Sequence, residues 1–287
     1  MVKINVICPI CKKKGYIEVT EKSMKDFSRG ILAINIAEKT ICKDSFVAYL
    51  DKNLNIRDYF IVDFQLELPE SIIEKDEKFD QEKKFLIEKV LDLDIIKYNL
   101  SANLLAYSLK VVFLGKKFML ILDNQQEFLH QHLINFYEYI TQNSFKLELK
   151  IISKKEYDDK KNYYKDYIVF DSKDIIYDVN KFLNPKKIAV ERRIIQKFLA
   201  ETDQNLSLLV LKNDIQKAFE LTKFILDYLT KFDSIKKIDI TELYQDLQEH
   251  FHIKITSIYL IFLLEIVENY YNIEIPGSLK RLLKILF

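Results

Sequence analysis

Three cysteines and one aspartate carry the clearest chemical signal in this chain. Cys8 and Cys11 are separated by two residues, a spacing that lets two thiolates bind one metal ion from a tight turn. Cys42 follows later in the chain, and Asp44 lies two positions after it. Three thiolates and one carboxylate can complete a tetrahedral zinc site, so the sequence predicts a structural zinc ion at these four residues. The lysines at positions 12–14 would offset part of the thiolate charge.

The Cys8–Cys11 pair has two other interpretations. Redox-active pairs share this spacing, but they normally lie near a strand–helix–strand unit, whereas Gly15 and the preceding lysines indicate a turn here. A turn that no longer binds metal is the other alternative. We favour the metal site, because a small β-rich segment with little core of its own needs such a cross-link.

A second set of polar side chains lies in the middle of the chain. Asp123 follows a strongly apolar run, and Glu148 and Lys150 lie on one face of an expected strand. Together they resemble the magnesium-binding set of restriction-endonuclease-like nucleases. Those nucleases carry the two motifs on adjoining strands of a hairpin, whereas an amphipathic helix is expected between them here. An alternating, half-buried strand is the simpler interpretation of residues 147–150.

The composition excludes several classes of function. The 287 residues include 44 basic and 43 acidic side chains, so the chain lacks the basic excess of a dedicated duplex-binding protein. Its four glycines lie far apart, which excludes a phosphate-binding loop and a dinucleotide fingerprint. The odd cysteine count argues against a disulfide framework. We find no signal peptide and no apolar run near the ~20 residues that span a bilayer, and therefore expect a cytoplasmic protein.

The distribution of apolar residues predicts a mixed α+β and α/β fold in four segments. A zinc-ribbon-like β domain is expected over residues 1–68, a charged linker over 69–83, an α/β domain over 84–184 and a helical domain over 185–287. The strands expected in the β domain are Asn5–Ile7, Tyr16–Val19, Ile31–Ile36, and the hairpin Phe46–Leu50 and Tyr59–Phe64.

The α/β domain is expected to contain a crossover between two strands. Strand 118–122, amphipathic helix 128–140 and strand 147–152 follow one another, an order that gives a right-handed crossover if the strands are parallel. The other elements expected here are helices near 85–95 and 100–114, a solvated loop over 154–165, and a hairpin of residues 167–170 and 175–177.

The C-terminal segment resembles a winged helix in outline. Asn184 and Pro185 are a helix start signal, and further helices are expected over 215–229, 241–250 and 257–271. A short strand at 273–275 and a last helix at 279–287, with a basic strip of Lys280, Arg281 and Lys284, complete the outline. The helix at 257–271 is apolar on nearly all sides, which predicts burial or dimerisation rather than DNA recognition.

Several short motifs of the N-terminal stretch also carry a family resemblance. They are Cys8-Pro9-Ile10-Cys11, Ile41-Cys42-Lys43-Asp44-Ser45-Phe46, Leu50-Asp51-Lys52-Asn53, Ile56-Arg57-Asp58-Tyr59 and Val62-Asp63-Phe64. Together they resemble an uncharacterised family of Asgard archaea, whose members have Cys-x-His-Ser-Phe where this chain has Cys42 to Phe46. The resemblance implies a zinc site of three cysteines and one histidine in that family, with Asp44 in the place of the histidine. It implies no activity.

These observations favour a non-enzymatic protein-interaction or scaffold protein with a structural zinc site. Its expected partner is another protein or a second copy of the chain. A nucleic-acid-associated transcriptional regulator is the first alternative, which a contiguous positive surface would favour. A metal-dependent, nuclease-like enzyme is the second, which a cleft gathering Asp123, Glu148, Lys150 and Asp171 would favour.

Overall fold

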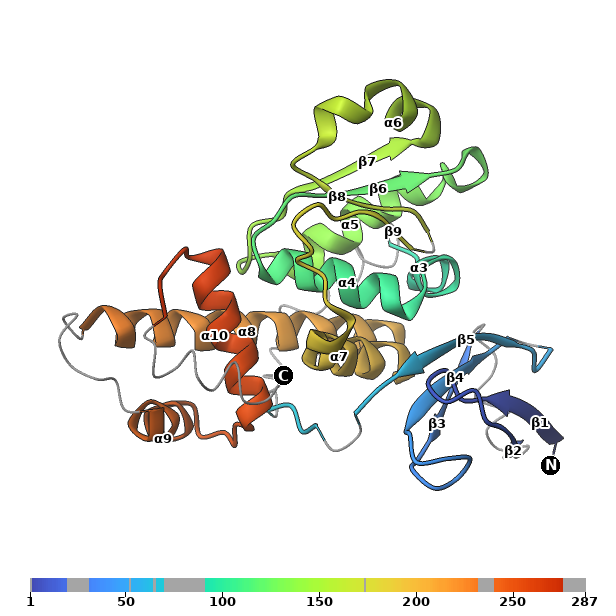
Figure 1. The fold of residues 1–287 in the computed structure, drawn as a ribbon, viewed down its shortest axis with the longest axis horizontal. Helices are drawn as coiled ribbons and strands as arrows, with labels where there is room; N and C mark the ends of the chain where they lie inside the picture. Colours follow the sequence, from blue (N-terminus) through green and yellow to red (C-terminus); the bar gives the residue numbers. More distant parts are fainter. Residues whose placement is uncertain are drawn as a thin grey trace.

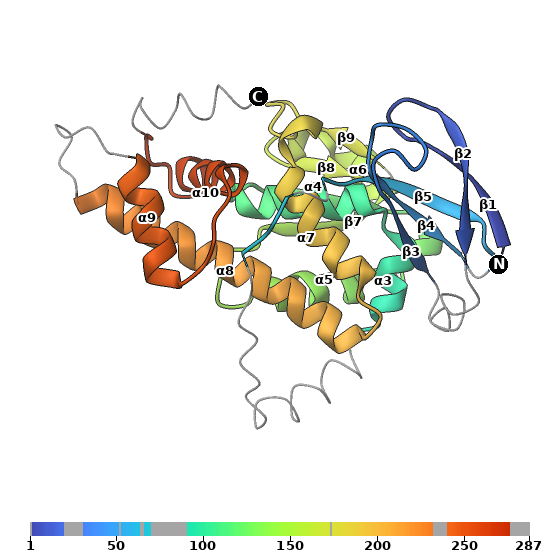
Figure 2. The same ribbon diagram turned by 90° about the horizontal axis from the view of Figure 1, so that it is seen from below.

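A computed structural model describes residues 2–19, 31–51, 53–63, 66–69, 91–172, 174–231 and 240–275. The chain has a mixed α/β fold, as expected, and its described strands form sheets of two, three and four strands. Its N-terminal strands lie at one end of the long axis and the C-terminal helices extend to the other (Figures 1 and 2). Most of the expected linker, and the greater part of the helix expected near 85–95, fall outside the described residues.

The N-terminal region, here called the head (residues 2–63), contains two antiparallel sheets. Strands β1 (Val2–Ile7) and β2 (Lys14–Val19) form a hairpin. Strands β3 (Leu32–Ile36), β4 (Phe46–Leu50) and β5 (Ile56–Ile61) form the second sheet, with β4 in the middle. The turn before β5 is held by Asp51, whose Oδ1 accepts hydrogen bonds from the backbone N–H groups of Asn53 and Asn55, each at 2.9 Å. Strand β5 therefore begins at Ile56, earlier than predicted.

Strand β4 joins the head to the rest of the molecule, because both of its faces are buried. Phe46, Ala48 and Leu50 belong to a small core that the head forms with its own hairpin. Val47 and Tyr49 point to the opposite face and belong to the main core of the helical body. One strand thus packs into two cores.

The middle of the chain forms the predicted crossover. Strand β6 (Phe118–Leu122) pairs in parallel with β7 (Leu149–Ser153) on one side and with β8 (Ile168–Phe170) on the other. Helix α5 (Leu129–Thr141) connects β6 to β7, and β9 (Ile175–Tyr177) pairs antiparallel with β8, which confirms the expected hairpin.

Two helices precede this sheet. They are α3 (Leu93–Asn99) and α4 (Ala102–Phe113). Helix α4 stops just before Gly115, as predicted. Gly115 has φ +63°, and its N–H donates to the carbonyl of Val112, while the N–H of Lys116 donates to that of Val111. This is a left-handed helix cap that glycine adopts without strain.

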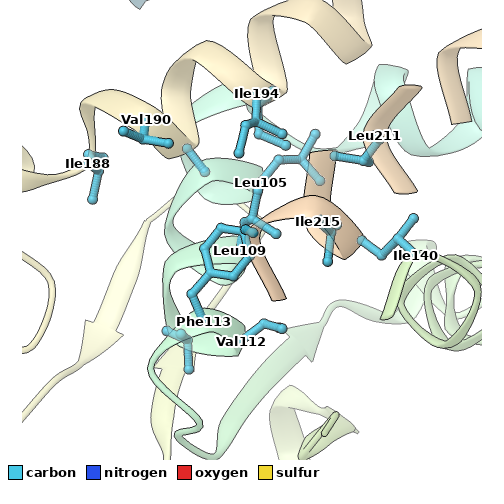
Figure 3. Close-up of a cluster of buried hydrophobic side chains, with 14 of the residues drawn as sticks. Leu105, Leu109, Val112, Phe113, Ile140, Ile188, Val190, Ile194, Leu211 and Ile215 are labelled. Carbon is cyan, nitrogen blue, oxygen red and sulfur yellow. The ribbon is translucent and has the colours of Figure 1, made fainter. Parts of the chain in front are cut away.

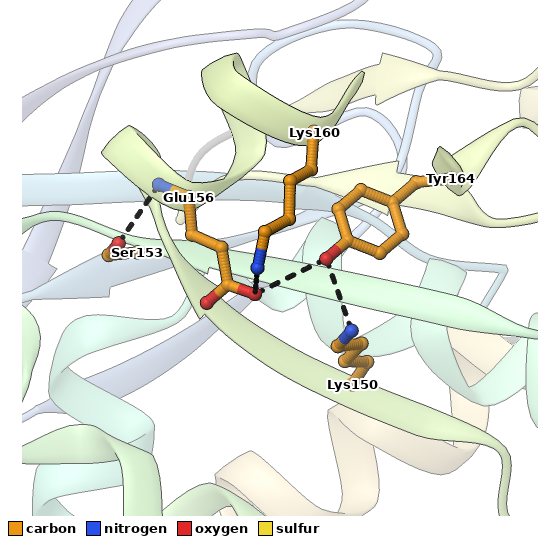
Figure 4. A network of polar contacts seen from close by, with 5 residues as sticks. All are labelled: Lys150, Ser153, Glu156, Lys160 and Tyr164. Carbon is orange, nitrogen blue, oxygen red and sulfur yellow. Dashed lines mark hydrogen bonds and ion pairs between the residues drawn. The ribbon is translucent and has the colours of Figure 1, made fainter. Parts of the chain in front are cut away.

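The prediction of a loop over 154–165 is wrong, because these residues form helix α6 (Lys154–Lys160) and a 3-10 turn (Lys161–Tyr164). The hydroxyl of Ser153 caps the helix by accepting from the N–H of Glu156 (Figure 4). The Glu156 carboxylate lies between Lys160 and the Tyr164 hydroxyl, which also accepts from Lys150 at 3.1 Å. A cap and pairs at helical spacing stabilise a segment whose charge suggests a loop.

The C-terminal helices are α7 (Ala189–Ala200), α8 (Gln204–Lys231), α9 (Ile240–Phe251) and α10 (Ser257–Tyr270). The start signal at Asn184 is confirmed, as its side chain caps a 3-10 turn (Pro185–Lys187) that precedes α7. Helix α10 is buried against α8 and α7, which confirms its predicted burial. Among the helices that the structure describes, none has the length and apolar character needed to cross a membrane.

The prediction of a strand at 273–275 is wrong. Within the described residues these positions have no ladder partner, and Ile275 is instead buried in the main core. The winged-helix outline therefore lacks this wing strand. The helix expected at 279–287 and the basic strip of Lys280, Arg281 and Lys284 lie outside the described residues.

The main core is centred on α4. Its apolar side chains, among them Leu105 and Leu109, meet Ile194 of α7 and Leu211 and Ile215 of α8 (Figure 3).

This core also encloses a charged cluster. Lys110 of α4 is buried, and its Nζ lies 3.1 Å from the Glu191 carboxylate of α7 and 2.6 Å from that of Glu265 of α10. The cluster ties three helices together at one point.

Candidate metal centre

Two turns of the head bring the four predicted side chains together. Cys8 and Cys11 lie in the turn between β1 and β2, and Cys42 and Asp44 lie in the connection between β3 and β4. One ligand atom from each residue lies within 4.8 Å of all the others. The four residues are thus close enough to hold one metal ion, and within the described residues they are the only such group.

Two of the distances among these atoms match those of a tetrahedral zinc site. With Zn–S near 2.3 Å and Zn–O near 2.0 Å, a tetrahedron places a sulfur and an oxygen ligand about 3.5 Å apart. Asp44 Oδ2 lies 3.5 Å from the sulfur of Cys8 and 3.5 Å from that of Cys42. The carboxylate oxygen is therefore placed as a fourth ligand would be.

Backbone N–H groups point at the sulfurs of both turns. Those of Ile10 and Cys11 donate to Cys8 Sγ at 3.4 Å, and that of Asp44 donates to Cys42 Sγ at 3.4 Å. Such bonds favour thiolates over thiols, because the donors stabilise negative charge on sulfur.

The pKa values of Cys11 and Cys42 are shifted in opposite directions. The backbone N–H of Lys13, followed by the Cys42 thiol, lowers the pKa of Cys11. At Cys42 the N–H of Asp44 lowers the pKa, but partial burial and the hydrogen bonds with Cys11, Cys8 and Asp44 outweigh it and raise the pKa to about 12. A bound cation would supply the charge that ionises such a thiol.

Gly15 sets how closely the two turns approach each other. A β-carbon at this position would lie 2.4 Å from Cδ1 of Ile41, the residue that precedes Cys42. A β-carbon would force the Ile41 side chain to shift, because Cγ2 lies only 3.1 Å away as well, so the absence of a side chain lets Ile41 pack directly on β2. The glycine thus allows the second turn to reach the first.

The residues of the nuclease hypothesis are not gathered into one cleft. Asp123 follows the carboxyl end of β6, while Glu148 precedes β7 and lies level with the amino end of β6. The parallel register therefore separates them by roughly 20 Å along the strands. Glu148 pairs with Lys146 at 2.7 Å, and Lys150 contacts Tyr164.

The surroundings of Asp123 and Asp171 also differ from that hypothesis. A pocket of about 330 Å³ beside Asp123 is lined by Glu127, His130 and Glu156 rather than by Glu148 or Lys150. Asp171 caps the turn before β9 by accepting from the N–H of Asp174.

The sequence reasoning missed a second feature, a cavity of about 1000 Å³ between the head and the helices. Its wall includes Tyr49 and Asp58. The sequence feature that could have indicated this cavity is Asp58, a carboxylate inside the strand Ile56–Ile61.

Comparison with known proteins gives no further guide to this site. No protein-family model, no curated protein and no solved structure matches the chain.

Proposed function

We propose that this protein is a non-enzymatic interaction protein whose head is held together by one structural zinc ion. Cys8, Cys11, Cys42 and Asp44 would bind it. The observation that supports this proposal is the convergence of four ligand atoms, from two turns, to within 4.8 Å. Four protein ligands fill a zinc tetrahedron and leave no position for a substrate, as in structural rather than catalytic sites. The resemblance to the Asgard-archaeal family, with aspartate for histidine, is in keeping with this assignment.

The knuckle hairpin, defined as residues 2–19, offers a surface for a partner protein. Tyr16 is 69% exposed on β2, and Ile10 is 47% exposed at the tip of the turn. Ile7 is also exposed on β1. Large apolar side chains gathered on one exposed element are typical of protein contacts. A metal ion beneath this surface would hold it in one shape.

Hydrogen exchange with and without chelator tests the structural role of the metal. Removing zinc with EDTA should speed amide exchange in β1 and β2, because the head core is small and loses its cross-link. Amides of α4 and α8 lie in the main core and should keep their protection. Unchanged exchange in β1 and β2 after verified metal loss would argue against a structural ion.

Affinity capture from the native host tests the interaction role. We expect Tyr16→Ala to lose proteins that the wild type captures. Tyr163→Ala is the matched control, since Tyr163 is 84% exposed on the 3-10 turn after α6. If both variants capture what the wild type captures, the knuckle hairpin is not the interaction surface.

A nucleic-acid-associated regulator is the second candidate, which one observation favours. Lys12, Lys13 and Lys14 are exposed in the hairpin that carries Tyr16. Exposed aromatics with lysines can stack bases and contact phosphates. Fluorescence anisotropy with labelled single-stranded RNA would decide: binding that weakens steeply with salt, and is lost when the three lysines are changed to alanine, would favour this candidate.

A further inference from the structure

Cys11 is the most accessible of the three cysteines. It is exposed in the turn of the knuckle hairpin, whereas Cys8 is buried in the small core of the head and Cys42 is half-buried in the second turn. The oxidation of a thiolate requires access to its sulfur. A small oxidant in solution therefore reaches Cys11 first.

Cys42 lies beside Cys11, although it comes from the other turn. The two sulfur atoms lie within 4.8 Å of each other, and neither residue belongs to a strand. Sulfurs in a disulfide are about 2 Å apart, so the two turns need to approach by less than about 3 Å for the bond to form. An exposed cysteine next to a second cysteine that can react with its sulfenic acid is the arrangement found in redox sensors.

One disulfide in this group would take the candidate metal centre apart. The chain contains three cysteines, and all of them belong to the group. A bond between Cys11 and Cys42 removes two of the four candidate ligands and leaves Cys8 and Asp44. Because zinc is bound by thiolates, the sulfurs of a disulfide no longer hold it. Two remaining protein ligands fall short of the four that a structural zinc ion requires.

We propose that hydroperoxides convert Cys11 and Cys42 into a disulfide and thereby release the zinc ion, an inference that rests on the proposed zinc site. In the loaded centre both sulfurs are thiolates. The Cys11 thiolate attacks the O–O bond of hydrogen peroxide, which gives a sulfenic acid and expels hydroxide. The Cys42 thiolate then attacks the sulfenic sulfur, forms the S–S bond and expels a second hydroxide. The two thiolates supply the two electrons that reduce the peroxide, and both hydroxides are protonated to water.

This oxidation would also change the proposed interaction surface. Ile10, which is 47% exposed, directly precedes Cys11 in the turn. Movement of Cys11 toward Cys42 would therefore displace an apolar side chain of that surface, and loss of the ion would remove the cross-link beneath it. Binding of a partner protein would thus depend on the oxidation state of the head.

Titration of the zinc-loaded full chain with hydrogen peroxide tests the proposal. A chromophoric chelator measures the released zinc, and a sample without peroxide is the control that should keep its ion. We expect one zinc ion released for each disulfide formed, with one of the three thiols left free. Peptide mapping should place the disulfide between Cys11 and Cys42, and reduction with dithiothreitol should restore zinc binding.

Two serine variants separate the roles of the cysteines without the need for bound zinc. Metal-free Cys8→Ser retains Cys11 and Cys42, and peroxide should form the disulfide in it as readily as in the metal-free wild type. Cys11→Ser is the matched variant, since it also keeps two cysteines. It should form a disulfide at least tenfold more slowly, because its accessible thiol is gone.

Three results would overturn the proposal. They are zinc that stays bound at a peroxide concentration that oxidises Cys11, a disulfide that joins Cys8 to Cys11, and equal rates of disulfide formation in the two serine variants. A wild-type chain that binds no zinc at all would contradict the proposed function, whereas zinc that binds and then resists peroxide would contradict this inference alone.

Discussion

A single oxygen of Asp44 distinguishes this centre from a site of cysteines and histidine. Carboxylates do bind zinc, but imidazole is the commoner partner of three thiolates in structural sites. Asp44 Oδ2 lies 3.5 Å from two of the sulfurs, which is the placement that a fourth ligand of a shared ion would need.

Asp44→His should therefore bind zinc more tightly than the wild type, and Asp44→Ala more weakly, by about tenfold or more in each case. Competition with a chromophoric chelator measures both affinities. Equal affinity for the wild type and Asp44→Ala would show that the carboxylate is not a ligand.

Gly15 is the second residue on which the site depends. Gly15→Ala should destabilise the head by about 1–3 kcal/mol, because the new methyl group meets Ile41 Cδ1 at 2.4 Å. Ile41→Val removes that carbon, so the double variant should recover much of the loss. Denaturant unfolding of the wild type, the two single variants and the double variant measures the energetic coupling between Gly15 and Ile41. If the losses of unfolding free energy in the two single variants simply add up in the double variant, residue 15 and Ile41 are not in close contact.

Spacing made the closeness of the three cysteines and Asp44 predictable, because a Cys-x-x-Cys turn is a local pattern. Asp44 was predicted as the fourth candidate ligand because it lies two positions after Cys42 in the sequence. The cavity was not predictable in this way, since Tyr49 and Asp58 become neighbours only through the β4–β5 register. Residues that become neighbours only through strand pairing show no characteristic spacing in the sequence.

The helices of the body meet at the cluster of Lys110, Glu191 and Glu265. Burial alone would lower the pKa of Lys110, but the carboxylates of Glu191 and Glu265 outweigh it and raise the pKa. The lysine is therefore charged in the folded protein. Burial raises the pKa of Glu191, despite the nearby ammonium.

Lys110→Met should destabilise the protein by about 3–5 kcal/mol, since it leaves a buried carboxylate without its partner. The raised pKa of Glu191 sets the sign of the pH dependence: its charged form opposes folding increasingly as the pH rises above the unfolded value of 4.5. The loss should hence be smaller near about pH 5 than near about pH 8.

Urea unfolding of Lys110→Met at both pH values measures this effect. The double variant Lys110→Met/Glu191→Leu is the control, and it should recover most of the stability, because it buries neither charge. An equal loss in the single and double variants would show that the ion pair itself is not responsible.

Elements with strong periodicity were predictable, and those that depend on their surroundings were not. Strand β6 and helices α4 and α10 follow directly from apolar spacing. Helix α6 was missed because its charges suggest a loop, although the Ser153 cap and Tyr157, which is buried, stabilise it. Residues 273–275 have strand-like composition, but Ile275 packs into the core without a pairing partner.

At the scale of the molecule, α10 closes the body. Phe262 packs edge-on against Phe113 of α4, with ring centres 5.1 Å apart. Phe262→Ala should cost about 3–5 kcal/mol of folding free energy. Phe128→Ala is the matched control, because Phe128 is 55% exposed and its loss should change stability by about 0.5 kcal/mol or less. Thermal unfolding compares the two, and similar shifts would contradict the burial of α10.

Strand β4 makes the head and the body parts of one structure, because its two faces belong to different cores. The candidate metal centre lies on the head side of β4 and the cavity of about 1000 Å³ on its body side. The proposed zinc ion would have a structural role in shaping the knuckle hairpin.

Native mass spectrometry of protein purified without chelator tests that assignment most directly. We predict one zinc ion per chain in the wild type and none in the variant with Cys8, Cys11 and Cys42 all changed to serine. A wild-type protein that remains metal-free even after incubation with zinc would contradict the account.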